Sequence, residues 1–195
     1  MRIGRHTKGG PDPQGLRDEL KEALTSERPN EKVCGPACQR TGPFKCSRDC
    51  PDIAKALSSD PERFPLETRI APLVFELKRL AVFEPCWSCE GHNHPDGTLW
   101  KLPQVWFYCR SVAHLRVLGE GVKGLHVAEK LNVPWQVSVT HSDSDNTDTT
   151  FSLHPNIDLD TTNLGALQKD IDTIAAHLRD SVFASALALS RQAHA

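Results

Sequence analysis

Apolar residues recur at helical spacing in two segments of the chain. Between residues 70 and 81 they follow an i, i+3, i+4, i+7 pattern, which gathers them on one face of a helix. A longer stripe starts after Asp160–Thr162, where the side chains suit a helix N-cap. Its members are Leu164, Leu167, Ile171, Ile174, Leu178 and Val182. We expect this C-terminal stripe to pack within the chain, or else on a second subunit of a homodimer.

Segments of a different kind predict strands between these helices. The expected strands cover residues 84–92, 99–109, 134–141 and 149–155, and the last two are predicted to form a hairpin. Pro103 limits the pairing of the second strand at one point, because it has no backbone N–H. Short helices are expected over residues 16–28 and 52–58, and residues 111–131 predict a helix that is broken near Gly119–Gly124.

The order of these elements predicts an α+β fold, in which helices cover a mostly antiparallel sheet. Residues 1–32 are expected to form a mobile tail and a short helix. Residues 33–58 are expected to form a small N-terminal, cysteine-rich appendage that binds zinc. The α+β domain itself then covers residues 59–195.

Composition and charge narrow the function classes only slightly. The chain has 195 residues, a formal net charge of −2 and a pI of about 6.5. These values give no general support for a nucleic-acid partner, although a local basic groove would still allow one. We expect no membrane partner, because no apolar stretch is long enough to cross a bilayer. Seven cysteines without a visible secretory signal indicate a reducing compartment, so we expect a cytoplasmic protein.

The first cysteine cluster has the spacing of a metal site. The segment CGPACQRTGPFKCSRDC places Cys34, Cys38, Cys46 and Cys50 in a C-x3-C-x7-C-x3-C arrangement. Two close pairs joined by a short loop can supply the four thiolates that a tetrahedral structural zinc ion prefers. An iron–sulfur cluster is the alternative cofactor, and a pair of disulfides would also explain the spacing. A closed site of four thiolates leaves no coordination position for chemistry.

A second cluster follows in the segment PCWSCEGHNH. It offers a second metal site, whose ligands would come from Cys86, Cys89, His92, His94 and Cys109. Alternatively the loop works without a metal, with Cys89, Glu90 and His92 as candidate catalytic residues and Glu90 as a general base, or it is a structural turn. The zinc-deaminase pattern is excluded because no H-x-E precedes the cysteines. Trp87 and Trp100 flank the loop and would suit stacking on a base or ring.

The run IAPLVFELKRLAVFEPCWSCEGH, followed by PQVWFYC, resembles a group of uncharacterised bacterial and phage proteins with an SCEGH motif. The likeness covers residues 66–110, and Ser88–His92 stand for the motif. The arrangement is also distantly similar to the wybutosine-synthesising tRNA methyltransferase family, whose S-C-x-G core matches Ser88, Cys89 and Gly91. That similarity implies tRNA binding and S-adenosylmethionine. The basic residue that follows glycine in that family is replaced here by His92.

Together these features predict a zinc-binding protein with a ligand- or partner-binding loop at the SCEGH motif. One alternative is an enzyme that acts on a nucleotide or RNA through Cys89, Glu90 and His92. Another is a structural or regulatory subunit. The substrate or ligand does not follow from the residues alone.

Overall fold

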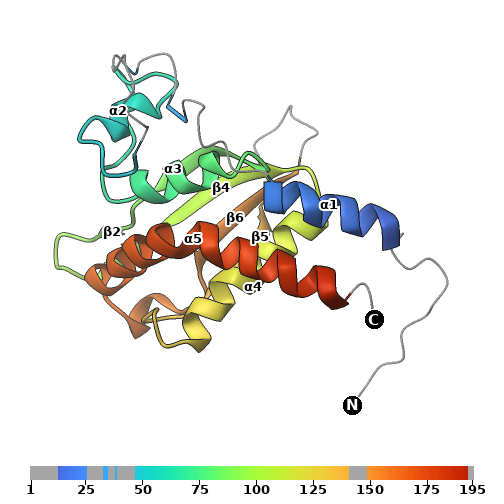
Figure 1. Ribbon diagram of the computed structural model, residues 1–195. Helices are drawn as coiled ribbons and strands as arrows, with labels where there is room; N and C mark the ends of the chain where they lie inside the picture. Colours follow the sequence, from blue (N-terminus) through green and yellow to red (C-terminus); the bar gives the residue numbers. More distant parts are fainter. Residues whose placement is uncertain (1–12, 26–32, 35–37, 39–46, 141–148, 193–195) are drawn as a thin grey trace.

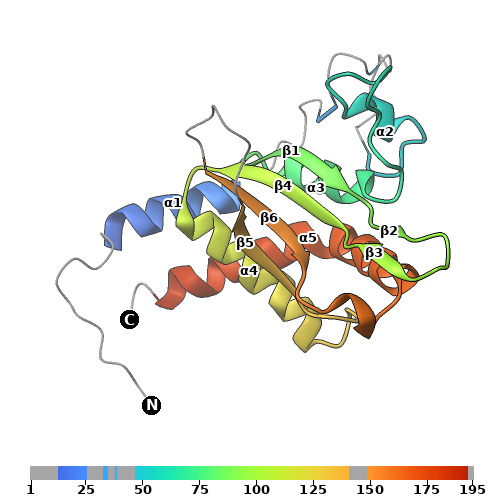
Figure 2. The ribbon, with the colours of Figure 1, turned by 180° about the vertical axis from the view of Figure 1, so that it is seen from behind.

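The computed structural model describes residues 13–25, 33–34, 38, 47–140 and 149–192, and every structural statement below refers to them. Helices lie on one face of a four-stranded sheet (Figures 1 and 2). All strand pairs in the sheet are antiparallel, so the predicted α+β class is confirmed. Among the helices of the described residues, none is both long enough and apolar enough to cross a membrane.

The main sheet has the strand order β1-β4-β6-β5. Its strands are β1 (Phe83–Cys89), β4 (Gln104–Cys109), β5 (Trp135–Thr140) and β6 (Thr150–Pro155). The last two pair in register as the predicted hairpin. β1 forms one edge of the sheet and pairs with β4 from Phe83↔Cys109 to Cys89↔Gln104. A bulge between Pro85 and Trp87 interrupts this pairing and leaves Cys86 without a partner in the register.

The single strand predicted over residues 99–109 is instead two strands. β3 (Leu99–Lys101) ends before Pro103, and β4 starts after it. Proline cannot donate to a strand ladder, so the chain changes partner at this point. β3 pairs with β2 (His92–Asn93) in a separate two-stranded sheet, which projects beyond the end of β1 (Figure 2).

The helices that cover the main sheet are α1 (Pro13–Thr25), α3 (Ala71–Arg79), α4 (Val112–Val127) and α5 (Leu164–Gln192). The apolar stripe of α5 is buried: Leu167, Ile171, Ile174, Leu178 and Val182 are all 0% exposed. The stripe therefore packs within the chain, and it offers no surface for the homodimer considered above. A short 3-10 helix, η1 (Leu159–Thr161), precedes α5.

The break predicted near Gly119–Gly124 is wrong, because α4 is continuous through these glycines. Gly121 explains why a glycine stands there. A Cβ atom at this position would lie 3.1 Å from the backbone carbonyl carbon and oxygen of Ser181 on α5. Glycine therefore serves the close approach of two helices rather than a break in one of them. The start of α4 is capped by Ser111, whose hydroxyl accepts the N–H of Ala113 at 3.0 Å.

The main core also includes α1, whose Leu20 and Ala23 are fully buried in it. A second, smaller apolar cluster joins the cysteine-rich appendage to α3. It combines Val33, Cys34 and residues of α2 (Ile53–Ala56) with Ala71 and Phe75 of α3. The guanidinium of Arg48 lies 3.0 Å from the carboxylate of Glu76, which is buried on α3. The appendage is therefore held to the domain by both apolar packing and an ion pair.

A buried carboxylate ties α5 to the segment before β5. Asp170 is 0% exposed, and its Oδ1 accepts the backbone N–H and the side-chain amide of Asn132, both at 2.8 Å. Its Oδ2 accepts the N–H of Val133 and the indole N–H of Trp135, both at 3.2 Å. Four donors thus satisfy a charge that would otherwise be costly to bury.

Candidate metal-binding site

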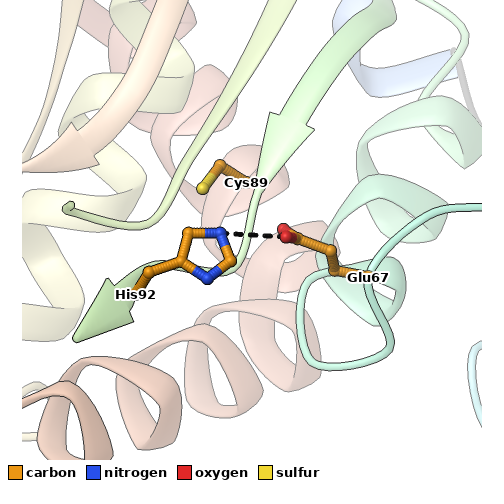
Figure 3. A group of neighbouring side chains, drawn as sticks. All are labelled: Glu67, Cys89 and His92. Atoms are coloured by element: carbon orange, nitrogen blue, oxygen red, sulfur yellow. Dashed lines mark ion pairs between the residues drawn. The ribbon is translucent and has the colours of Figure 1, made fainter. Parts of the chain in front are cut away.

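Three side chains from separate segments converge at the end of β1. A carboxylate oxygen of Glu67, the Sγ of Cys89 and an imidazole nitrogen of His92 all lie within 4.8 Å of one another (Figure 3). The Nε2 of His92 is 3.0 Å from Oε1 of Glu67. Glu67 precedes α3, Cys89 ends β1 and His92 starts β2. Within the described part of the chain, this is the one group of three or more potential metal ligands at such distances.

Gly91 gives the chain the turn that brings Cys89 and His92 to the same place. Its φ is +83°, a conformation that other residues rarely adopt. The space around it is also closed. A Cβ at Gly91 would lie 2.7 Å from Cδ1 of Leu164 and 3.1 Å from the carbonyl oxygen of Lys101. The Leu164 side chain of α5 and the backbone of β3 thus approach this turn from two sides, and the positive φ together with the close carbonyl of Lys101 favours glycine here.

Two carboxylates fasten the loop that holds Glu67 to the SCEGH turn. The N–H of Glu90 donates to Oε2 of Glu67 at 2.6 Å. In the opposite direction, the N–H of Arg69 donates to Oε2 of Glu90 at 2.9 Å. Glu90, the predicted general base, therefore holds the backbone of the neighbouring segment. Glu67 uses its Oε2 for the hydrogen bond from Glu90, and its Oε1 lies beside His92. The carboxylate next to His92 is therefore that of Glu67 and not that of Glu90.

Glu67 was not singled out by the sequence. It lies more than twenty residues before Cys89, in the segment SSDPERFPLET, which has no ligand spacing of its own. Only the folded structure places Glu67 beside Cys89 and His92, because residues 57–67 lie across the groove from β1. Of the five ligands predicted for the second cluster, the structure places Cys89 and His92 together with Glu67.

The other three predicted ligands of that cluster lie elsewhere. Cys109 pairs with Phe83 at the far end of β1, whereas Cys89 pairs with Gln104. Gln104 is five residues from Cys109 on β4, which corresponds to about 17 Å along a strand. Cys86 is exposed at the bulge. His94 belongs to the turn after β2, where its ring centroid is 5.9 Å from that of Trp100. The observed group therefore keeps Cys89 and His92 of the predicted set, lacks Cys86, His94 and Cys109, and gains Glu67.

The thiol of Cys89 is held in its neutral form when no cation is bound. Only 2% of Cys89 is exposed, and burial raises the pKa of its thiol. The nearby carboxylates of Glu67 and Glu90 add to this rise, whereas a hydrogen bond from the Gly91 backbone and the charge of Lys101 oppose it. Neither of these brings the pKa of the thiol back to its usual value.

A groove of about 900 Å³ borders the three side chains. It runs between β1, α3 and residues 57–67, and Glu67, Cys89 and His92 all line it. Two large aromatic side chains on its walls are unusually exposed, Phe64 at 68% and Trp87 at 40%. The Nζ of Lys101 lies over the Trp87 ring, 4.8 Å from its centroid.

The first cysteine cluster stays a prediction. Cys34, Cys38 and Cys50 all pack against the small apolar cluster on α3. Cys46, the fourth predicted ligand, lies outside the described residues. The structure thus brings three of the four cysteines to one region of the appendage.

Comparison of the chain with models of known protein families, with curated proteins and with solved structures finds no match. The two resemblances noted for the SCEGH segment therefore stay predictions. The function has to be inferred from the geometry of the site.

Proposed function

We propose that this protein binds a zinc ion through Glu67, Cys89 and His92, and that the ion presents an open coordination position to the groove. The observation that carries this proposal is the convergence of the three donor atoms within 4.8 Å. Carboxylate, thiolate and imidazole are all common zinc ligands. Zinc sites with three protein ligands keep a fourth position for water or a ligand, unlike closed structural sites.

The orientation of His92 favours a metal site over a catalytic triad, in which a histidine lies between a nucleophile and an acidic residue. In such a triad the two imidazole nitrogens serve different partners, one the acid and the other the nucleophile. Here Nε2 of His92 faces Glu67, and the Cys89 sulfur lies on that same side of the ring (Figure 3). The three donor atoms are thus near enough to one another to bind one ion. Burial raises the pKa of the Cys89 thiol, and a zinc ion bound here would displace the proton of this thiol.

A zinc ion at this position would bind a ligand from the groove through an oxygen, nitrogen or sulfur atom. We therefore propose ligand binding at the metal as the function of the SCEGH loop. Catalysis is the second candidate, favoured by the open position, because zinc polarises a bound carbonyl or activates a bound water. In either case Gly91 and Glu90 are positioning residues. Gly91 shapes the turn, and Glu90 holds the segment that carries Glu67.

The direct test is the zinc content of protein purified under reducing conditions, loaded with zinc and dialysed. Glu67→Gln, Cys89→Ser and His92→Gln should each remove one zinc ion per chain. Cys86→Ser and His94→Gln are matched controls, because they remove the same donor types from the same segment and should leave the content unchanged. Loading with cobalt adds a second readout in a Cys38→Ser, Cys50→Ser background, which removes the predicted four-thiolate site. In that background the charge-transfer band of the cobalt–thiolate bond should be lost on Cys89→Ser and kept on Cys86→Ser.

The predicted appendage site must be separated from this one. A Cys38→Ser, Cys50→Ser variant should lose zinc bound by the first cluster and keep the ion at Glu67, Cys89 and His92. If folded Glu67→Gln, Cys89→Ser and His92→Gln proteins all retain the zinc content of the parent protein, the proposed site does not exist.

A further inference from the structure

The groove follows the free edge of β1 rather than one face of the sheet. Successive side chains of a strand point to opposite faces, so a groove over one face is lined by alternate residues. Here consecutive residues line it on both sides of the bulge, Glu84 with Pro85 before it and Trp87 with Ser88 after it. Their cross-strand partners show the alternation: Trp87 stands opposite Trp106, and Ser88 stands opposite the buried Val105.

The edge of β1 carries main-chain groups that can pair with another strand. Within the described residues, β1 pairs with β4 alone, so its other edge borders the groove. Edge strands are often protected by a proline or a bulge. β1 has both at its start, Pro85 and the bulge at Cys86, which leaves Trp87–Cys89 as the regular part. An unprotected edge beside a groove is a surface on which an extended peptide can add a strand.

The walls of the groove suit a peptide with an apolar and an acidic side chain. The exposed rings of Phe64 and Trp87 offer apolar contact to a side chain. Each carries a cation beside it: Arg63 lies 5.6 Å from the Phe64 ring centroid, and Lys101 lies over Trp87. Neither cation forms an ion pair with a carboxylate of the described residues.

Other charges in the groove argue against a nucleic-acid strand. Lys78 is 3.6 Å from the carboxylate of Glu84 and is thereby neutralised. Glu84 and Glu67 both line the groove and would repel a phosphate backbone. Nucleic-acid affinity depends on many protein cations that contact the phosphate backbone. Among the described residues, this groove offers two unpaired cations, Arg63 and Lys101, and the free edge of β1.

We propose that the groove binds an extended peptide, which pairs with the free edge of β1, places an apolar side chain between Phe64 and Trp87 and places an acidic side chain beside Lys101. Main-chain pairing is expected at Trp87–Cys89, the regular part of the edge. The groove continues along Glu84–Cys86, where it would hold the flanking residues of a peptide of about six residues. This inference goes beyond zinc binding, because pairing with the strand edge does not require the metal.

The test uses the full chain and a synthetic library of acetylated, amidated hexapeptides. Each member carries one Phe or Leu, one Glu and varied remaining residues, and binding is measured by fluorescence anisotropy. The best binder is then N-methylated at one backbone amide at a time. Because successive N–H groups of a strand point in opposite directions, methylation should have an alternating effect in the part of the peptide that pairs with Trp87–Cys89. There it should weaken binding at least tenfold at a residue whose N–H faces β1 and less than twofold at the next residue.

Two variants of the protein test the side-chain contacts. Lys101→Gln should weaken binding of the Glu-containing peptide at least threefold, but it should not weaken binding of the same peptide with Gln. Phe64→Ala should weaken both peptides. Lys123→Gln and Val139→Ala are matched controls, because they change an exposed lysine and an exposed apolar residue away from the groove.

Four results would overturn the inference: no peptide binds, N-methylation has an equal effect at all positions, it has no effect at any position, or an oligonucleotide binds the groove in place of the peptides. Zinc content is measured in the same samples. The protein could show the alternating effect of N-methylation and yet bind no zinc at Glu67, Cys89 and His92. That result would support the peptide groove and refute the metal proposal.

Discussion

Replacing Gly91 by alanine tests the turn on which the whole site depends. Two costs arise at this position. The first is backbone strain, because φ is +83° and an L-residue there costs about 1–2 kcal/mol. The second is steric, because the added Cβ meets Cδ1 of Leu164 at 2.7 Å, Cδ of Pro103 at 3.0 Å and the carbonyl oxygen of Lys101 at 3.1 Å. The Leu164 side chain can move aside, but a proline ring and a backbone carbonyl cannot.

Gly97 provides a matched control for separating these costs. Its φ is +88°, but a Cβ there would meet nothing within 4 Å. Gly97→Ala therefore carries the backbone cost alone, and both variants gain equally from the reduced freedom of the unfolded chain. We expect Gly97→Ala to lose about 1–2 kcal/mol. Crowding in a packed site adds about 1–3 kcal/mol, so Gly91→Ala should lose about 2–5 kcal/mol.

Thermal and chemical unfolding measure this difference. For a chain of this size each kcal/mol shifts Tm by about 2–4 °C, so Gly91→Ala should lower Tm by about 4–20 °C and Gly97→Ala by about 2–8 °C. Gly91→Ala should also weaken zinc binding, because a shift of the turn that relieves these contacts would displace Cys89 or His92, which flank Gly91. Equal losses of Tm in the two variants, together with unchanged zinc affinity in Gly91→Ala, would show that the contacts at Gly91 do not shape the site.

Three further predictions concern the fold around the site. Asp170→Asn should lower the free energy of unfolding in urea by about 3–5 kcal/mol, because the amide NH2 of the asparagine would face two of the four donors. The control Asp172→Asn, at a half-exposed carboxylate, should lower it by less than about 1 kcal/mol. Gly121→Ala should be less stable than Gly119→Ala by about 2–3 kcal/mol in the same assay, because only the former meets Ser181, and equal stabilities would contradict the proposed helix contact. The hydroxyl and the N–H of Thr98 lower the pKa of Asp96, so the stabilisation of this turn is present above the unfolded-state pKa and is lost as pH falls through the folded-state pKa. An NMR titration should find the pKa of Asp96 below its usual value and closer to that value in Thr98→Val.

The parts of the fold that the sequence predicted are those that depend on local periodicity. The stripe from Leu164 to Val182 repeats at helical spacing over five turns, so it predicted both a helix and its buried face. Gly121 shows the opposite case. A glycine inside a helix has the same local signal whether it breaks the helix or admits a neighbour, and only the position of Ser181 distinguishes the two.

Part of the candidate site was predictable because it, too, depends on residues that are close in sequence. Cys89, Gly91 and His92 are close in sequence, and a tight turn at a glycine keeps their side chains close in space. Glu67 could not be predicted, because its position depends on hydrogen bonds between two loops, from Glu90 to Glu67 and from Arg69 to Glu90. Cys109 was included in the predicted set because it ends the strand that follows the loop. The antiparallel pairing of β1 and β4 places Cys89 and Cys109, which end these two strands, at opposite ends of the pair.

The two proposals meet at Cys89, which lines the peptide groove and supplies a ligand to the proposed metal site. A peptide that pairs with β1 as far as its last residue would bring a backbone carbonyl to the open position of the ion, because the strand edge and the metal ligands share this residue. Binding of the selected hexapeptide to cobalt-loaded protein should then change the cobalt absorption spectrum, and a peptide shortened by the residues nearest Cys89 should not change it. An unchanged spectrum with the full-length peptide bound would mean that the groove and the metal act separately, each supported by its own test.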